Sequence, residues 1–398
     1  MIIEGATLSL LAPMAAVLSG FVVIGAALPV LPLHVSHNLG FGSVIVGMVA
    51  GTQFAASLVS RVWSGSFADE NGGKRAVLVG LVAATAAGLF YLVSSAVANA
   101  PVLSVTILVV GRAVLGGAES FIITGGVAWG LALVDAGHSG KVIAWVGTAM
   151  FAALAFSGPL GTMLFTAYGF AAIGLLTTLL PLLVLGSLMR APNPRIQLRQ
   201  RKSDLRAVFG AVWLPGVGAA LASIGYCSIL AYSSLLYADN HWRPVWLGFT
   251  AFGASLIAAR VVCGHLPDRY GGAKIALLFV LVQSAGLLLI GLAQSSVLAS
   301  FGAALAGLGY SLVYPGLGAE AVGGTSPQNR GLAMGIYTAF LDVAMALGSP
   351  ALGWAADRAG LSVVFFISAG VTFCTTAVAL HLAYNAHHAN SRTANHVR

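Results

Sequence analysis

Three charged residues lie deep inside long apolar stretches of this sequence: Arg112 and Glu119 in residues 102–131, and Asp342 in residues 331–355. If these stretches are helices that cross a bilayer, each charge costs at least about 3 kcal/mol unless it faces a partner or water. An acid in such a place can take up and release a proton. We therefore predict that Glu119 and Asp342 bind protons and that Arg112 faces a cavity. The alternative for each is a buried ion pair or hydrogen-bonded group that fixes helix packing.

A second motif occurs twice, between apolar stretches. Its two copies are 199 positions apart, which is half of the chain length: Arg61, Gly65, Asp69, Gly72 and Arg75 in the first, and Arg260, Gly264, Asp268, Gly271 and Lys274 in the second. Internal repeats of this kind are typical of secondary transporters built from two similar halves.

The repeated motif has a mechanical interpretation. Gly65 and Gly264 are small enough to let another backbone come close. Asp69 and Asp268 follow one helical turn later, where a carboxylate can favour the positive end of a facing helix. The paired glycines then make a tight turn into the next helix. We predict that the two copies form a latch that closes the cytoplasmic side, the alternative being an ordinary charged turn.

Glycine and proline also occur together inside the apolar stretch 142–165, as Gly158, Pro159 and Gly161. Such residues kink a spanning helix and permit close packing. They are also simply common in spanning helices. We predict a helix-kink motif at this position.

Several other polar residues are candidates for a binding site. Gln53, Tyr226 and Tyr232 could line a substrate cavity, although each alone is as well explained by packing. His34 and His37 have a spacing that could suit a metal, but they lie at an expected loop position without cysteine or carboxylate neighbours. We therefore expect no metal site and no cofactor.

The composition places most of the chain in lipid. It is 58% hydrophobic and only 8% charged, against about 25% charged in soluble domains. The first apolar run, residues 8–33, is longer than the roughly 7–15 apolar residues of a signal peptide and lacks a basic region before it. We therefore expect an uncleaved first span.

The pattern of apolar stretches predicts an all-α membrane protein with twelve transmembrane helices in two pseudo-symmetric six-helix bundles. The expected spans are 8–32, 43–67, 76–97, 102–131, 142–165, 168–189, 207–237, 245–267, 274–293, 297–322, 331–355 and 361–384. The expected domains are an N-terminal bundle, 1–189, a basic cytoplasmic linker, 190–206, and a C-terminal bundle with a short cytoplasmic tail, 207–398.

Orientation follows from the positions of basic residues. Most of the nineteen lysines and arginines fall in loops on one side of the predicted bundle, which is the cytoplasmic side by the positive-inside rule. Both termini are then cytoplasmic, and the net charge of +8 needs no nucleic-acid partner. The expected partners are the lipid bilayer, a small-molecule substrate and protons, and we expect a monomer.

Signatures of enzymes and pumps are missing from the sequence. There is no Gly-x-x-x-x-Gly-Lys-Ser/Thr phosphate loop, which argues against an ATP-driven pump. Nothing resembles a Ser/His/Asp or paired-carboxylate hydrolytic site outside the predicted spans. We expect a protein that is not an enzyme, and a channel or membrane enzyme is the less favoured alternative.

The loop pattern Gly65-x-x-x-Asp69-x-x-Gly72, followed by basic residues, resembles the signature loop of the major facilitator superfamily. The second copy matches it as well, while Glu70 stands where the family usually has a basic residue. Span number, central loop and repeat extend the resemblance over the whole chain. Within the superfamily the chain looks closest to the bacterial YhhS-like inner-membrane carriers, near the sugar- and drug-efflux groups.

The resemblance implies roles for two further motifs. Arg112, in the fourth span, is similar to a family motif tied to proton coupling. Gly158-Pro159 and Gly161 resemble, in part, a motif of the family's drug antiporters. The implied function is secondary active transport across the bacterial inner membrane by alternating access. Proton-coupled efflux of a small organic solute by antiport is favoured, and proton-coupled uptake of a sugar or organic acid is the alternative.

Overall fold

The computed structural model describes residues 2–134, 139–191, 205–326 and 329–396. Within these residues the chain forms helices and turns and no strand. By its internal contacts the chain divides into two compact units, Met1–Arg201 and Lys202–Arg398. The division falls inside the expected linker 190–206, of which residues 192–204 lie outside the described part of the chain.

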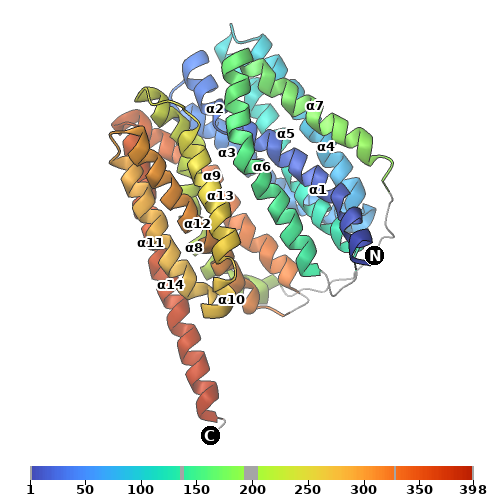
Figure 1. Ribbon diagram of the computed structural model, residues 1–398, viewed down its shortest axis with the longest axis vertical. Coiled ribbons are helices and arrows are strands. Elements are labelled where there is room, and N and C mark those ends of the chain that lie inside the picture. The colour runs from blue at the N-terminus through green and yellow to red at the C-terminus, as the bar shows by residue number, and fades with distance from the viewer. Residues whose placement is uncertain (1, 135–138, 192–204, 327–328, 397–398) are drawn as a thin grey trace. The chain divides into compact units, whose positions relative to one another are not determined.

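The helices of the N-terminal unit are shown in blue to green in Figure 1. They are α1 (Ile2–Ala27), continued by α2 (Val30–Leu33) and the π-helical turn η1 (His34–Asn38), then α3 (Ser43–Asn71), α4 (Gly73–Ala96), α5 (Pro101–Ala132), α6 (Ser139–Tyr168) and α7 (Phe170–Leu188). Those of the C-terminal unit are α8 (Leu205–Asp239), α9 (Leu247–Cys263), α10 (Leu266–Tyr270), α11 (Gly272–Gly291), α12 (Ser296–Gly323), α13 (Arg330–Ala359) and α14 (Leu361–His396).

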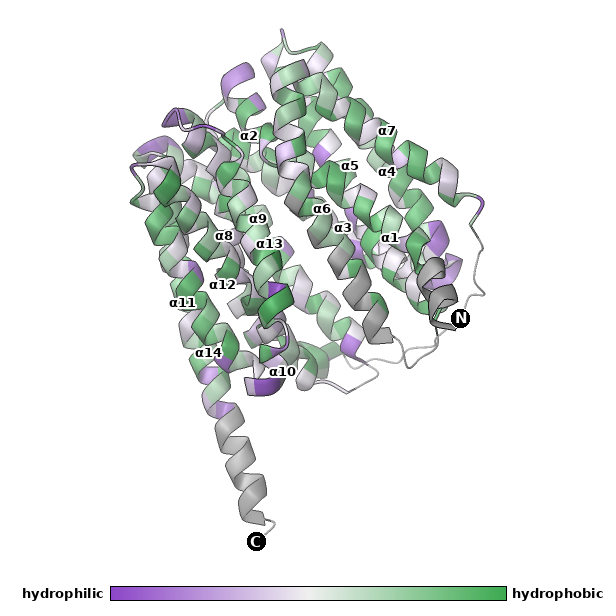
Figure 2. Cartoon of the chain, in the orientation of Figure 1, coloured by the Kyte–Doolittle hydropathy of each residue, from purple (hydrophilic) through white to green (hydrophobic). Residues whose placement is uncertain are grey.

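The prediction of an all-α membrane protein with twelve spanning helices is confirmed. Ten helical segments of the described chain are long and apolar enough to cross a bilayer by length and composition, and α9 is a shorter apolar helix. The helix α6 adds a further apolar segment of 30 residues. Figure 2 shows the hydrophobic colouring along these helices, with hydrophilic residues gathered mainly at helix ends and connections.

Close glycine contacts hold the helices of each unit together. In the N-terminal unit, a Cβ added to Gly73 would overlap the backbone of α5 at Trp129 and Gly125, so α4 and α5 can cross only with glycine there. In the C-terminal unit, a Cβ on Gly272 would overlap the carbonyl oxygen of Gly316, which fixes the crossing of α11 and α12 in the same way. The internal repeat thus extends from sequence to helix packing.

A second pair of glycine contacts repeats between the units. A Cβ on Gly116 of α5 would overlap the carbonyl oxygen of Gln53 in α3. A Cβ on Gly307 of α12 would overlap the carbonyl oxygen of Phe252 in α9. The helix pairs α3–α5 and α9–α12 are therefore structural equivalents, and Gln53 and Phe252 occupy the same place in the two units.

The two copies of the loop motif differ in one respect. The helix α3 runs unbroken to Asn71, whereas α9 ends at Cys263 and a separate short helix, α10, carries Asp268 of the second copy. Pro267 lies in the first turn of α10 and has no backbone N–H with which to continue a helix from α9. The expected span 245–267 is therefore shorter in the structure.

The two ends of the chain also depart from expectation. The first span was expected to end at residue 32, but the helical path continues through η1 to Asn38, so His34 is buried and only His37 is exposed. At the other end, α14 continues as a helix to His396, where a short tail after residue 384 was expected.

Candidate functional site

The N-terminal unit pairs an acid with an amide inside its helices. The Gln53 Nε2 of α3 donates a 2.7 Å hydrogen bond to the Glu119 Oε2 of α5. Gln53 is fully buried and Glu119 is half-buried. The Gln53 Oε1 has no hydrogen-bond partner among the described residues. An amide offers both a donor and an acceptor. The Gln53 Nε2 can therefore donate to a neighbouring carboxylate, and the Oε1 can accept from a neighbouring carboxylic acid.

Arg112, on α5 of the same unit, is fully buried. Its Nε donates to the carbonyl oxygen of Val49 and its Nη1 to the Tyr91 hydroxyl, both at 3.4 Å. Its Nη2 has no hydrogen-bond partner among the described residues. Arg61 and Arg112 both lie near enough to Glu119 to act on its charge. The predicted members Arg112, Glu119 and Gln53 are therefore brought together in one helix group, α3–α4–α5.

Hydroxyl groups continue this polar region along α3 and α5. The Ser120 Oγ donates to the carbonyl oxygen of Ser57 at 2.7 Å and lies 3.1 Å from the Ser57 Oγ. One further turn toward the repeated loop, the Ser64 Oγ donates to the Thr124 Oγ1 at 3.3 Å. These contacts bind α3 to α5 and hold Glu119, which precedes Ser120, in its place.

The equivalent position of the C-terminal unit is aromatic. Tyr310 of α12 follows Gly307 by the same three positions by which Glu119 follows Gly116. Its ring stacks on Tyr226 of α8 with centroids 4.8 Å apart and lies 6.4 Å from Phe252, while its hydroxyl is 3.2 Å from the Ser223 Oγ. The predicted cavity residue Tyr226 thus lies in a cluster of three rings.

Arg260 joins this aromatic cluster from the end of α9. Its Nη2 donates a 3.1 Å hydrogen bond to the carbonyl oxygen of Ser311. Tyr226, Tyr310 and Tyr314 lie near its guanidinium. Arg260 was predicted to belong to a cytoplasmic gate. In the C-terminal unit it reaches back toward the tyrosines.

The remaining predicted cavity residues lie on α13 and α8. Asp342 is 3% exposed and therefore buried within the C-terminal unit. Tyr232 is fully buried, and its hydroxyl donates to the carbonyl oxygen of Ser349. The Cys227 Sγ lies 2.8 Å from the Ser349 Oγ, so one turn of α13 is bound to α8 by two side chains. Tyr232 is occupied in helix packing.

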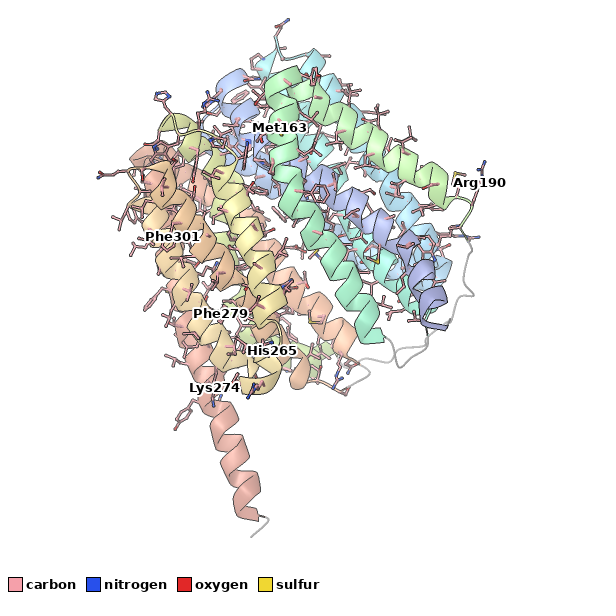
Figure 3. All side chains as sticks on the ribbon, in the orientation of Figure 1. Met163, Arg190, His265, Lys274, Phe279 and Phe301 are labelled. Carbon is pink, nitrogen blue, oxygen red and sulfur yellow. The ribbon has the colours of Figure 1, made fainter. Side chains whose placement is uncertain are left out.

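The repeated loops have the glycine conformation that the sequence predicted. Gly72 and Gly271 end their helices at φ +90° and +93°, which only glycine adopts without strain. Asp69 and Arg75 are exposed at the first loop. Lys274 is exposed at the second, where Figure 3 shows it near His265 at the α10 end of its unit. The side chain of Asp268 lies outside the described part of the chain.

Gly65 was predicted to let another backbone come close, but in the structure this close approach occurs at Gly73. A Cβ on Gly65 would meet no atom within 4 Å, whereas the crossing of α4 and α5 needs the glycine at position 73. At Gly264 an added Cβ would meet only the preceding turn of its own chain, at Arg260. The structure therefore assigns the packing role to the second glycine of each Gly-Gly pair.

The Gly-Pro motif joins α6 to α1. The helix α6 continues through Pro159 to Tyr168, and the Thr162 Oγ1 donates to the carbonyl oxygens of Gly158 and Pro159 at 3.1 and 3.0 Å. A Cβ on Gly161 would overlap the backbone of Ala26. The motif was expected to serve as a kink; the contact that it makes in the N-terminal unit is a close helix crossing.

Sequence reasoning missed the contacts of three residues. Tyr91 is fully buried in α4, and its hydroxyl accepts a hydrogen bond from Arg112. No sequence pattern around Tyr91 indicated this contact. Lys74 is 7% exposed, and its Nζ donates to the carbonyl oxygens of Met189 and Ala191 at the end of α7. His34 stacks face to face on Phe170 at 3.9 Å. Lys74 is one of the basic residues that follow Gly72 in the loop motif, but its place in the sequence does not predict that it bonds the end of α7.

Comparison with known proteins identifies the fold and the sequence group. The family model described as Major Facilitator Superfamily matches residues 14–319 and 245–397. An MFS-type transporter of Salmonella typhimurium is 39% identical over 373 residues, covering 94% of this chain and 96% of the relative. The MFS-type transporter YhhS of Escherichia coli is 34% identical, covering 92% of this chain and 89% of the relative. Both relatives are described as uncharacterised.

Solved structures share the architecture at low sequence identity. The D-xylose-proton symporter matches with a TM-score of 0.77 and 14% identity, covering 94% of this chain and 96% of that structure. The nucleoside transporter NupG matches with a TM-score of 0.75 and 12% identity, covering 94% and 99%. These likenesses concern the fold alone.

Proposed function

Because the chain belongs to the major facilitator superfamily and is a secondary transporter of a solute, we propose that it exports a small organic solute in exchange for protons. In this proposal Glu119 is the residue that binds the proton. The chain acts by alternating access as a monomer in the bacterial inner membrane, with both termini cytoplasmic. The family is one of transporters and not of enzymes.

The observation that carries the proposal is the pairing of Glu119 with a neutral amide. The bond from Gln53 stabilises the carboxylate at 2.7 Å, while the Gln53 Oε1 without a partner is available to accept from the acid form. A carboxylate held by an arginine ion pair would keep its charge. The Gln53–Glu119 pair instead supports both protonation states at one place inside the helix group.

Two other residues support proton coupling. Arg112 is a fully buried positive charge whose two hydrogen bonds go to a carbonyl oxygen and a tyrosine hydroxyl. Its charge acts on Glu119, so loss of a proton from Glu119 is balanced within the same unit. Asp342 is a buried acid of the C-terminal unit and is the second candidate for proton binding.

The direction of transport rests on the Gly-Pro motif. Gly158, Pro159 and Gly161 resemble in part a motif of drug antiporters, and Gly161 is required where α6 crosses α1. The repeated loops with Gly72 and Gly271 have the proposed role of a cytoplasmic latch. Their identical backbone turns support a common role in the two units.

A vesicle assay tests the proposal. The purified chain is reconstituted into liposomes, a panel of labelled sugars, organic acids and drugs is offered, and a pH gradient of either sign is imposed. An antiporter accumulates its substrate when the interior is acidic, whereas a symporter accumulates it when the exterior is acidic. Flux that ignores a gradient of either sign would overturn proton coupling, and ion currents far above carrier rates would indicate a channel.

A further inference from the structure

The residue His34 lies at a break in the first spanning segment. Two prolines, Pro29 and Pro32, interrupt the helical hydrogen bonds there because they have no backbone N–H. The chain then forms the π-helical turn η1, in which the Leu39 N–H bonds the carbonyl oxygen of His34 at 3.0 Å. Single π turns are frequent at functional sites. His34 therefore lies where the backbone already departs from a regular helix.

The His34 imidazole is buried without a polar partner. It is 2% exposed, and neither ring nitrogen has a hydrogen-bond partner among the described residues. Among the described residues, its ring stacks in parallel on Phe170, 3.9 Å between centroids and 5° between planes. A neutral imidazole has one donor and one acceptor, and each buried group left unpaired costs about 1–3 kcal/mol. Such a cost is retained only where the surrounding structure or the function requires it.

A chain of contacts runs from His34 through Phe170 and Tyr91 to Arg112. Tyr91 of α4 lies behind Phe170 at 5.7 Å between ring centroids, and its hydroxyl accepts a hydrogen bond from Arg112 of α5. The described side chains of α1, α6 and α7 include no charged group, and the charged residues of α3 lie at its far end, from Arg61 onward. Glu119 is the other charged residue of α5, and within the described N-terminal unit neither ring nitrogen of His34 has a carboxylate within hydrogen-bonding distance.

Two glycines flank the contact. Gly169, between α6 and α7, has φ +72°, and Gly40, after η1, has φ +75°, and an added Cβ at either position would meet no atom within 4 Å. Neither glycine is required by close packing; each follows a helical turn, and its N–H bonds the carbonyl oxygen four residues earlier. Phe170 is the first residue of α7, directly after one of these glycines. The two stacked rings therefore join the end of the first spanning segment to the beginning of α7.

We propose that His34 is a second proton-binding site of this carrier, and that the structure holds its unprotonated, closed form. A proton that reaches the imidazole places a charge on a buried ring whose nitrogens have no hydrogen-bond partner among the described residues. The ring then leaves Phe170 for water, and η1 and the beginning of α7 separate. The proposal rests on the proposed function only in assuming that protons drive the carrier, and it names a site other than Glu119.

Hydrogen–deuterium exchange of the purified full-length chain in lipid nanodiscs tests the proposal. Exchange is measured at about pH 8 and about pH 5.5, on either side of ordinary imidazole titration, and corrected for the intrinsic pH dependence. In the wild type we expect peptides covering residues 28–41 and 166–176 to exchange about tenfold faster at the acidic pH, since these segments open locally. His34→Gln, which cannot take a charge, should lose this acid response.

His37→Gln is the matched control, because the same substitution is made three residues away at an exposed histidine. It should keep the wild-type acid response. Phe170→Leu, which removes the stacking partner, should exchange fast at both pH values. An acid response that survives in His34→Gln, or one absent from the wild type, would overturn the proposal.

The same measurement separates this proposal from the proposed function. Glu119→Gln should keep the acid response of residues 28–41 although it loses proton-driven transport. If Glu119→Gln transports normally while His34→Gln loses its acid response, the assignment of Glu119 fails and that of His34 stands. A melting temperature of His34→Gln within a few degrees of the wild type shows that the comparison is made on folded protein.

Discussion

The two units place different chemistry on the same backbone contact. In the N-terminal unit α3 and α5 meet at Gly116, and the neighbouring side chains are Gln53 and Glu119, joined by a hydrogen bond. In the C-terminal unit α9 and α12 meet at Gly307, and the equivalent side chains are Phe252 and Tyr310. The helix crossing is repeated and the side chains are not.

The difference separates packing from chemistry. A helix crossing needs a glycine because a Cβ would overlap the facing carbonyl oxygen, and this requirement is the same in both units. The side chains beside the crossing are free to differ once the backbones are placed. The N-terminal unit therefore carries a group that can hold a proton, and the C-terminal unit carries stacked rings that can contact an apolar or planar solute.

The largest expected effect concerns the crossing itself. Gly116→Leu and Gly307→Leu should each destabilise the protein by about 3 kcal/mol or more, because the side chain would overlap backbone that has no room to move. Thermal unfolding and gel filtration in detergent measure the loss. Gly186→Leu and Gly210→Leu, at positions with no atom within 4 Å of an added Cβ, are the matched controls, one in each unit. A crossing glycine whose replacement behaves like its control would break the equivalence.

The second prediction concerns the chemistry at the two equivalent positions. Glu119→Gln should lower flux driven by a pH gradient about 100-fold, a usual loss when a proton-transferring group is removed, while solute exchange without a gradient continues. Tyr310→Phe removes one hydroxyl at the equivalent place and should leave the response to the gradient intact. Proteoliposome flux with the substrate found in the panel measures both. Equal loss of gradient response in both variants would show that the units share the coupling role.

The third prediction concerns the turns, where the units agree. Gly72→Ala and Gly271→Ala should each destabilise the protein by about 2 kcal/mol, because a Cβ is strained at φ +90° and +93°. The melting temperatures of the two variants should fall together. Gly65→Ala is the control, since it lies in the same motif in a regular helix with open space around it. A large difference between the melting temperatures of the two variants would show that the two loops are not structurally equivalent.

The smallest expected effect concerns the ends of α4 and α11. Lys74 bonds carbonyl oxygens at the end of α7, whereas the equivalent residue Ala273 donates its backbone N–H to Glu320 at 2.9 Å. Lys74→Met and Glu320→Met should each cost about 1 kcal/mol, the usual net worth of such hydrogen bonds. Arg75→Met, at an exposed position beside Lys74, should leave the melting temperature unchanged. A matching loss in Arg75→Met would assign the effect to loop charge instead.

The sequence alone determined the helices, the repeat and the turns. Spanning helices are recognised by the length of an apolar stretch, which is a local property. The confirmed family is likewise indicated by short local motifs, such as the loops with Gly72 and Gly271. Boundaries were less well predicted where a local interruption decides them. Pro267 separates α10 from α9, and η1 carries the first segment past residue 32 to Asn38.

Only the tertiary structure decided which side chains meet. Gln53 and Glu119 are 66 positions apart, and Arg112 and Tyr91 come from different helices, so no spacing in the sequence could pair them. The same reason applies to His34, whose sequence neighbours suggested a loop, whereas its burial depends on Phe170 far along the chain. Periodicity along one helix gives the face on which a residue lies; the partner on that face is set by how the helices cross, which here is determined by glycines whose contacts are long-range.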